Sequence, residues 1–385
     1  MVLTNGFNPD QRVYKEARSL TDRGFEVEIL CWDRQDDYSL KTQIYSPNIC
    51  VKRFGPSSKY GTGLKQVLPF IGFMKRIRKY LNDVDFDYLY CHDFDGLVAA
   101  KLFNFTKSKL IYDSHEYELE RSTGRKSSKL RRVMVYHLEK FLIKKAALVI
   151  MVNDSIAEEV QTIYKLKEKP LVIRNMPEKW SLDQEVTQDV RKQLRKELNV
   201  SEDTFMVMYH GGISPTRGIE KMLEAVSKVP GIVALIMGQG SKDYIQALKA
   251  YTKTLNIEKR VLFKDAVAIE ELWQFVSAAD VGVSLAANTH KNHYYMLPNK
   301  LFENIQSLTP IIGSDFPEIR KIVKTFDIGL LVNPEESDEI AKTILTMKDN
   351  QKQYQTFKTN LIKAKEELHW GLEKVKLQEK IEGLL

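Results

Sequence analysis

The chain has 385 residues, 43% of them hydrophobic and 28% charged, which is typical of a folded protein, argues against disorder and predicts two domains. Its net charge of +7 is too small by itself to indicate nucleic-acid binding, and Cys31, Cys50 and Cys91 form neither a metal-ligand pattern nor a disulfide framework. Because there is no run of about 20 apolar residues and the opening segment does not resemble a signal peptide, we expect a cytoplasmic protein.

Short apolar runs alternate with longer helical patterns in the first half of the chain. The runs are rich in Val, Ile, Leu and Tyr and are bounded by polar or turn residues, which is typical of buried parallel strands. We expect strands at residues 1–4, 27–31, 88–91, 110–112, 148–152 and 171–174. We expect helices at residues 11–23, 64–81 and 128–145. This order predicts βαβ units and a doubly wound parallel sheet.

A polar segment interrupts this pattern, and the same alternation then starts again. The second set of expected strands is 205–209, 233–237, 261–264, 281–285, 310–312 and 329–332. The expected helices are 219–226, 242–255, 269–278, 299–307 and 337–348. The chain therefore predicts an α/β fold with two Rossmann-like domains, 1–177 and 199–365, joined by a linker at 178–198. We expect a final helix at 366–385 to pack back toward the first domain.

Ligands in such folds bind at the carboxyl ends of the parallel strands, so we expect a site in the loops there and in the cleft between the two domains. The first candidate loop is YHGGISPTRG, residues 209–218. Gly211 and Gly212 permit a tight turn, amides at a helix N-terminus favour an anion, and Arg217 can add a bidentate phosphate contact. An ordinary turn with a surface arginine is the alternative.

Two further segments in the second half could contact a ligand. The turn MGQG contains Gly238, and a simple tight turn explains it equally well. The segment LPNKLFENI, residues 297–305, begins a helix that carries Lys300, Leu301 and Glu303. A carboxylate such as that of Glu303 can accept hydrogen bonds from both hydroxyls of a ribose. The alternative is a helix start whose charges serve the helix dipole and solvation.

Polar residues also follow two neighbouring strands of the first domain. His92 and Asp93 follow the strand at 88–91, and the run DSHE, which contains His115, follows the strand at 110–112. Such residues either cap the next helix or contact a ligand. Two histidines at adjacent strand ends favour a ligand site.

In order and spacing, these segments resemble the retaining glycosyltransferases of family 4, which have the GT-B architecture. The resemblance covers nearly the whole chain. The segments that carry it are PDQRVYKEARSLTDRGFEVEIL, YCHDFDGL, IYDSHEYE, YHGGISPTRGIEKMLEAV, IMGQG and LPNKLFENIQSLTPIIGSD.

The resemblance implies that the second domain holds a nucleotide-sugar donor. Glu303 matches the family's ribose-binding glutamate, and Arg217 and Lys300 match basic positions near the donor diphosphate. The phosphate-approaching turn corresponds to Gly211 and Gly212. Gly238 and Leu301 also fall at donor-binding positions.

In the first domain the resemblance implies the acceptor side and part of the catalytic site. His115 matches a histidine that faces the donor sugar, and it joins Arg217 and Lys300 as a catalytic candidate. Asp10 and Arg12 lie in a loop that closes over the diphosphate or meets the acceptor, and His92 is placed with them. The resemblance also implies that the acceptor hydroxyl attacks on the face that the phosphate leaves, so no dedicated base is expected. No Asp-x-Asp metal signature stands out at a strand end, so we expect Arg217 and Lys300 to take the place of a metal ion, and we expect no cofactor.

The expected function is transfer of a hexose or N-acetylhexosamine, from a UDP-sugar, to a glycan or lipid-linked acceptor in cell-surface polysaccharide synthesis. One departure from the family pattern is Tyr295, which stands where the first glutamate of the E-x7-E motif should be. This leaves sugar recognition open. The alternatives are a non-catalytic partner subunit, which Tyr295 favours, and a nucleotide-sugar epimerase, which shares the architecture.

Positive charge is concentrated between residues 121 and 145, with a second basic group at 75–80. A basic amphipathic helix suits an anionic membrane surface, and we expect contact with the inner face of the plasma membrane. The alternative is a helix with its apolar side in the core and a solvated basic face. No recognition motif accompanies the charge, so we expect no nucleic-acid partner.

Overall fold

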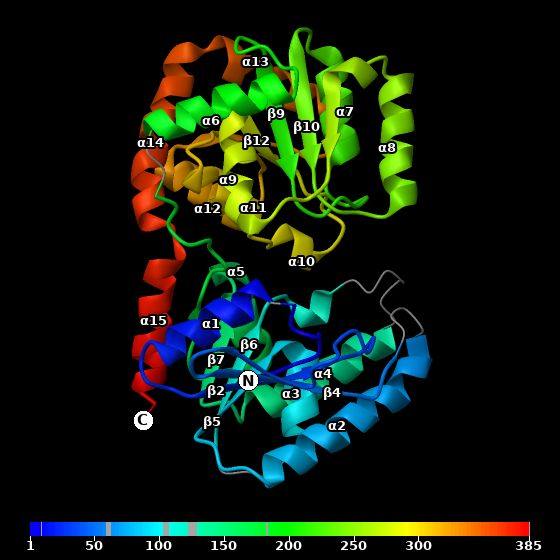
Figure 1. The fold of residues 1–385 in the computed structure, drawn as a ribbon, viewed down its shortest axis with the longest axis vertical. Coiled ribbons are helices and arrows are strands. Elements are labelled where there is room, and N and C mark those ends of the chain that lie inside the picture. The colour runs from blue at the N-terminus through cyan, green and yellow to red at the C-terminus, as the bar shows by residue number, and fades with distance from the viewer. Residues whose placement is uncertain (9, 59–62, 103–107, 122–128, 182–183, 385) are drawn as a thin grey trace. The chain divides into compact units, whose positions relative to one another are not determined.

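The structure is a computed structural model that describes residues 1–8, 10–58, 63–102, 108–121, 129–181 and 184–384. The chain divides into two compact units (Figure 1). Unit 1 consists of Met1–Arg174 and Glu373–Leu385, and unit 2 is Asn175–Leu372. Each unit contains one mainly parallel sheet with helices packed on it, so the predicted α/β fold of two parallel-sheet domains is confirmed.

The sheet of unit 1 has the order β3-β4-β2-β1-β5-β6-β7-β8, and every strand is parallel to its neighbours except β3. The strands are β1 (Val2–Leu3), β2 (Val27–Trp32), β3 (Thr42–Ser46), β4 (Ile49–Phe54), β5 (Tyr88–His92), β6 (Lys109–Ser114), β7 (Leu148–Met151) and β8 (Leu171–Val172). The strand order reverses at β1, which lies between β2 and β5. Ligands bind at such a reversal, beyond the carboxyl ends of the strands.

The helices of unit 1 cover this sheet. They are α1 (Gln11–Thr21), η1 (Gly63–Gln66), α2 (Val67–Asn82), α3 (Asp93–Lys101), η2 (Glu118–Glu120), α4 (Lys129–Ile143) and α5 (Asp154–Tyr164). Asp10 begins α1 because its carboxylate accepts a hydrogen bond from the Val13 amide (3.3 Å). The predicted helix start at residue 128 lies outside the described residues, as do Arg125 and Lys126 of the predicted basic segment.

The hairpin of β3 and β4 was not predicted. Its signal is the alternation of buried Ile49 and Val51 with less buried neighbours along β4. In β3 the side chains are exposed or half-buried, so the sequence there lacks an apolar run. The turn at Asn48, where φ is 61°, joins the two strands.

Unit 2 has a six-stranded, wholly parallel sheet in the order β11-β10-β9-β12-β13-β14. Its strands are β9 (Phe205–His210), β10 (Ile232–Met237), β11 (Val261–Lys264), β12 (Val281–Ser284), β13 (Ile311–Ser314) and β14 (Gly329–Val332). Its helices are α6 (Gln184–Glu197), α7 (Ile219–Lys228), α8 (Lys242–Thr254), η3 (Glu258–Arg260), α9 (Ile269–Ala278), α10 (Lys291–Tyr294), α11 (Asn299–Gln306), α12 (Pro317–Phe326), α13 (Ser337–Asp349) and α14 (Gln351–Glu367). Aliphatic residues of the central strands and of α7 form the core.

Helix α6 occupies most of the segment that the sequence suggested as a linker. Leu194 is buried, and the Arg195 guanidinium is 1% exposed, with a hydrogen bond to Asp280 (2.6 Å). Arg191 donates to the other oxygen of Asp280, also at 2.6 Å. The polar segment therefore belongs to unit 2, where it is held by the two ion pairs to Asp280 and by the buried side chain of Leu194.

The final helix, α15 (Trp370–Glu382), contributes its residues from Glu373 onward to unit 1. The Arg174 amide donates to the Glu373 carboxylate (2.9 Å), and the Gln378 amide group donates to the Ser19 carbonyl oxygen (2.6 Å). Leu377 is fully buried. These contacts complete unit 1 with residues from the end of the sequence.

Candidate functional site

In unit 2, the two predicted glycine loops lie against each other at the carboxyl ends of β9 and β10. The Gly211 amide donates to the Met237 carbonyl oxygen (3.0 Å), and the Ile213 amide donates to that of Gln239 (2.7 Å). At Gly238 φ is 153°, and a Cβ there would lie 1.8 Å from the Gly211 carbonyl oxygen. Gly238 therefore shapes the Gly211 turn through close backbone contact.

Two basic residues, Lys300 and Arg217, belong to the surroundings of this turn. Lys300, in the first turn of α11, places Nζ 3.6 Å from the centroid of the Tyr209 ring. Burial and the like charge of Arg217 lower the pKa of Lys300 to about 7, against a smaller opposing effect of Glu303. Within the described part of the chain, neither Lys300 nor Arg217 forms an ion pair. This edge of unit 2 therefore suits an anionic ligand.

Glu303 lies one turn after Lys300 and is held by a buried histidine. The His210 Nε2 atom lies 2.9 Å from a carboxylate oxygen of Glu303. Because a carboxylate only accepts hydrogen bonds, Nε2 carries the proton. His210 was in the predicted loop, at the end of β9, but its pairing with Glu303 was not predicted.

Leu301 is placed differently from its neighbours. It is fully buried in an apolar cluster with Phe302 and Ile305, and its amide donates to the Pro298 carbonyl oxygen (3.0 Å). Its side chain serves the core of unit 2 and is not available to a donor.

In unit 1, a buried charge network lies at the carboxyl ends of β5 and β6. The Arg12 guanidinium forms two hydrogen bonds with Asp113, at 2.9 and 2.7 Å, and one with the Ile173 carbonyl oxygen (2.9 Å). Its Nε also lies 3.1 Å from Glu16, which accepts a hydrogen bond from the Tyr90 hydroxyl (2.6 Å). The network joins α1 to strands β5 and β6 and to the segment that follows β8.

The two predicted histidines meet on the same carboxylate. His115 Nε2 lies 2.9 Å and His92 Nδ1 3.3 Å from Oδ2 of Asp113. The His115 amide donates to Asp93 (2.9 Å). Burial alone would lower the pKa of His115, but Asp93 and Asp113 outweigh it and raise the pKa to about 9. His115 is therefore a cation near neutral pH.

Asp113 is the centre of this network and was not predicted as a site residue. Burial opposes its ionisation, yet Arg12 and His115 hold its pKa well below the usual range. His92, Asp113 and His115 offer ligand atoms within 4.8 Å of one another, which could suit a cation. Arg12 already occupies both Asp113 oxygens and His115 is protonated, so these residues fit a hydrogen-bonded network better than a metal site.

A cavity of about 190 Å³ adjoins the network in unit 1. Its lining residues lie at or after the carboxyl ends of β1, β2, β5 and β6: Leu3, Thr4, Asn5, Asp10, Arg34, His92, Asp93, Asp95, His115 and Arg121. Polar and charged side chains dominate this lining, so the cavity suits a hydroxyl-rich ligand.

Arg12 is not in the loop where the resemblance placed it. It lies in the first turn of α1 and is 3% exposed, because its guanidinium forms buried ion pairs with Asp113 and Glu16. Asp10 does remain at the loop, as the cap of α1 and as part of the cavity wall.

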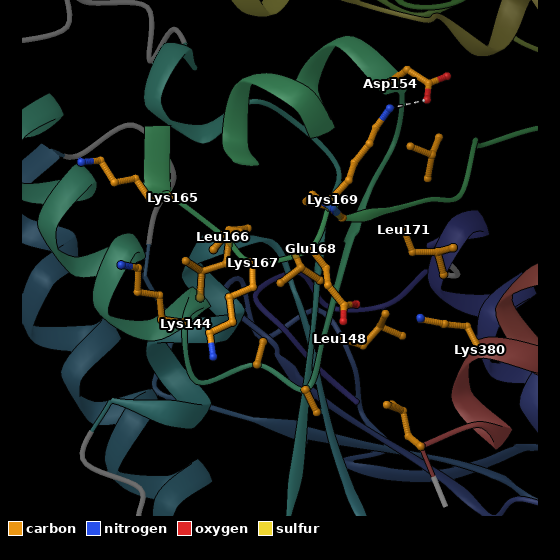
Figure 2. Close-up of a pocket in the computed structure, with 17 residues that line it drawn as sticks. Lys144, Leu148, Asp154, Lys165, Leu166, Lys167, Glu168, Lys169, Leu171 and Lys380 are labelled. Carbon is orange, nitrogen blue, oxygen red and sulfur yellow. Dashed lines mark hydrogen bonds and ion pairs between the residues drawn. The ribbon is translucent and has the colours of Figure 1, made fainter. Parts of the chain in front are cut away.

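A larger cavity of about 940 Å³ in unit 1 contains none of the predicted residues (Figure 2). Most of its lining comes from the segments that precede β7 and β8 and from the first residues of these strands, and the rest is Asp154 of α5, Lys380 of α15 and Leu384. These segments are at the amino ends of the strands, so this cavity is at the opposite edge of the sheet from the histidines. Several lysines line it, and one of them, Lys169, is paired with Asp154 (3.0 Å).

Two family models match the chain. Residues 10–176 match the model described as Glycosyltransferase Family 4, and residues 190–364 match the model described as Glycosyl transferases group 1. The chain belongs to the family 4 type of glycosyltransferases. The predicted family, a group of transferase enzymes with the GT-B fold, is thereby confirmed.

Curated relatives of this glycosyltransferase match only part of their own length. An uncharacterized glycosyltransferase of Methanocaldococcus jannaschii is 25% identical over 66% of this chain and 64% of its own. The alpha-monoglucosyldiacylglycerol synthase of Streptococcus pneumoniae is 24% identical over 61% of this chain and 53% of its own. The matches thus span less than two thirds of either relative.

Solved structures share the fold over almost the whole chain. Sucrose-phosphate synthase from Thermosynechococcus elongatus has a TM-score of 0.80, with 18% identity, and covers 99% of this chain and 95% of its own. Anabaena HepE in complex with UDP-glucose has a TM-score of 0.74, with 19% identity, and covers 99% and 98%. No helix in the described ranges of this glycosyltransferase meets the length and apolarity that a bilayer-spanning helix requires.

Tyr295, the departure from the family motif, ends the short helix α10 and is half-buried. Its ring lies beside that of Tyr294, with 5.6 Å between centroids. In the same helix, burial, His290 and Arg217 lower the pKa of His293 to about 4. The segment therefore presents aromatic groups and a lysine, Lys291, where the family motif leads us to expect a carboxylate.

Proposed function

We propose that the protein is a retaining glycosyltransferase that moves a hexose or N-acetylhexosamine from a nucleotide sugar, a UDP-sugar, to a glycan or a lipid-linked acceptor. The observation that carries the proposal is the pair of cations beside the Gly211 turn. Lys300 and Arg217 repel each other, and a nucleoside diphosphate supplies the negative charge that both require.

The residues of unit 2 fit the parts of such a donor. The Gly211 and Gly212 turn leaves room for the diphosphate to approach the backbone, and Glu303, oriented by His210, can accept hydrogen bonds from the ribose hydroxyls. Two names support the choice of ligands: HepE was solved with UDP-glucose, and one relative is named for a glucosylated diacylglycerol.

The same residues can assist bond cleavage. Negative charge grows on the diphosphate as it leaves, and Arg217, Lys300 and the turn amides would stabilise it. The departing phosphate takes the proton of the acceptor hydroxyl, which attacks the same face. In unit 1 we assign His115, which Asp113 and Asp93 keep cationic, to contact with the transferred sugar. We assign the adjoining cavity, which Asp10 and His92 line, to binding of the acceptor.

A thermal-shift panel with UDP, GDP, ADP and their sugars tests this proposal, because a ligand that binds the folded state raises the melting temperature. We expect UDP and a UDP-sugar to stabilise the protein and the other bases to have less effect. A flat response would contradict the proposal and favour the non-catalytic partner subunit that Tyr295 suggests. Interconversion of UDP-sugars without an acceptor would favour an epimerase.

UDP affinity is expected to fall as the pH rises above about 7. Lys300 is only partly protonated there in the free protein, and the bound diphosphate favours its charged form, so binding takes up a proton. The decline approaches about tenfold per pH unit. Calorimetric titration with UDP above pH 7 measures this decline. The terminal phosphate, whose second pKa is about 6, is already ionised in that range and does not cause the decline.

The matched variant for this measurement is Lys300→Gln, which keeps a polar side chain of similar length but cannot titrate. Its affinity for UDP should be weaker and nearly independent of pH above about 7. An unchanged pH profile in Lys300→Gln would show that another group controls binding.

A further inference from the structure

Unit 2 has a polar cavity of its own, away from the Gly211 turn. Its volume is about 590 Å³, which is within the range of cavities that bind small organic ligands. Most of its lining comes from α6 and α14 and from the places where α9 and α11 end, and we call it the α6–α14 cavity. These helices pack together, since α9 contacts α6 and α11, and α11 contacts α14 (Figure 1).

The α6–α14 cavity and the Gly211 turn are at opposite edges of one sheet. Asp280 and Leu308, which line the cavity, precede β12 and β13, whereas the Gly211 turn follows β9. These strands are parallel, so their amino ends share one edge and their carboxyl ends the other. Helix α11 spans the two edges: Lys300 is in its first turn and Ser307 ends it, about 10 Å further along the helix axis. A small ligand in the cavity would therefore not contact Lys300.

The wall of the cavity carries an excess of positive charge. Its charged side chains are four basic and two acidic ones: Arg191, Lys192, Arg195, Lys358, Glu202 and Asp280. Asp280 is already paired with two guanidinium groups, because Arg191 and Arg195 each donate to it at 2.6 Å. Four positive charges against two negative ones leave an excess of two, so the cavity suits an anion.

Lys358 lacks an anionic partner. Its Nζ atom donates to the Leu308 carbonyl oxygen (2.6 Å), and it forms no ion pair among the described residues. Burial and the like charge of Arg191 lower the pKa of Lys358 to about 8, against a smaller opposing effect of Asp280. An ammonium group has three N–H donors, so two of them remain for a ligand after the contact with Leu308.

Ser307 gives a second, independent indication of a ligand. It lines the cavity and is 2% exposed, and in the part of the chain that the structure describes its Oγ atom has no hydrogen-bond partner. Buried hydroxyl groups are normally hydrogen-bonded, because an unpaired one is destabilising. Since Lys358 donates to the residue that follows Ser307, the ammonium and the hydroxyl reach the same part of the cavity.

We propose that the α6–α14 cavity binds a phosphate group, either as free phosphate or as the phosphomonoester of a small polyol. Such a group carries a charge of about −1.5 to −2 at neutral pH, which matches the excess of two positive charges, and its oxygens accept hydrogen bonds from Lys358 and Ser307. The wall also has neutral hydroxyl and amide side chains that suit a polyol: Thr187, Gln188, Gln355 and Thr359. The proposal does not depend on glycosyl transfer, because binding is measured without a donor.

Calorimetric titration of the full chain tests the proposal. The ligands are inorganic phosphate and glycerol 3-phosphate, with acetate and glycerol as controls at the same ionic strength. We expect both phosphates to bind and both controls to give no response. Tighter binding of glycerol 3-phosphate would identify the ligand as a phosphomonoester, and tighter or equal binding of inorganic phosphate would identify free phosphate. Absence of phosphate binding, or equal binding of acetate, would overturn the proposal.

Two variants test whether the phosphate is bound in this cavity. Lys358→Gln should weaken binding at least about tenfold, since it removes a charged donor. Ser307→Ala should weaken binding about fivefold, and without phosphate it should keep or raise the melting temperature, because it removes an unpaired buried hydroxyl. The matched control is Lys352→Gln, at an exposed position of α14, which should bind phosphate like the wild type. Unchanged affinity in Lys358→Gln and Ser307→Ala would overturn the proposal.

Arg217→Ala distinguishes the cavity from the Gly211 turn. Arg217 does not line the cavity, so this variant should bind phosphate with unchanged affinity, and saturating UDP should leave phosphate binding in place. Loss of phosphate binding in Arg217→Ala but not in Lys358→Gln would place the phosphate at the Gly211 turn and overturn the proposal. Failure of UDP to bind while phosphate still binds would count against the proposed function alone.

Discussion

Replacing Arg217 with alanine is expected to abolish glycosyl transfer and leave the fold intact. Arg217 is half-buried and supports no ion pair among the described residues, so its loss removes charge stabilisation of the departing diphosphate and little else. A fall in kcat/KM of about 10²–10³ is the size seen when one such contact is lost. Turnover of a UDP-sugar by the purified variant measures it, with Lys253→Ala, an exposed lysine of the same unit, as the control.

Glu303→Ala should also abolish transfer, by the loss of the ribose contact and of the partner of His210. Glu303→Gln keeps a hydrogen-bond acceptor in place and separates the two effects: it should retain the melting temperature while the donor KM rises. Wild-type turnover in Arg217→Ala or Glu303→Ala would rule out the corresponding role.

Replacing Arg12 with methionine is expected to destabilise unit 1 by about 3–5 kcal/mol, because the buried carboxylates of Asp113 and Glu16 would lose their shared guanidinium partner. Burial already raises the pKa of Glu16, which shows how costly this charge is even with Arg12 present. Urea-induced unfolding measures the change in the free energy of unfolding.

The same helix supplies the control for Arg12. Arg18 is exposed, so Arg18→Met should change the free energy of unfolding by less than about 0.5 kcal/mol. The double variant R12M/D113N removes both charges and should recover part of the loss. Equal stability of Arg12→Met and Arg18→Met would show that the network contributes nothing to the fold.

Most strands could be predicted because buried parallel strands are continuous apolar runs, as in β9 and β10. The hairpin of β3 and β4 could not, because its outer strand is half solvated and Ile44 is 81% exposed. The linker was misassigned for the opposite reason: Arg191 and Arg195 suggested a solvated segment, although Asp280 allows both to pack against unit 2.

Some features of the candidate site could likewise be predicted from the sequence, and others could not. Gly211 and His115 follow from their place after predicted strands, and Lys300 follows from its place at the start of a predicted helix. The pairing of His210 with Glu303, and the meeting of Arg12, His92 and His115 on Asp113, join residues far apart in the sequence. Such contacts depend on strand order and register, which the apolar pattern alone does not specify.

The return of α15 to unit 1 has a consequence for protein synthesis. Residues 1–174 leave the ribosome before unit 2, but Glu373, Leu377 and Gln378, which complete their packing, are made after it. Unit 2, which is continuous in the sequence, can therefore finish folding while unit 1 still lacks its final helix. During translation, unit 1, the acceptor half of the proposed enzyme, cannot complete its packing until unit 2, the donor half, has been made. A nascent chain that stalls before residue 373 would therefore have an incompletely folded unit 1.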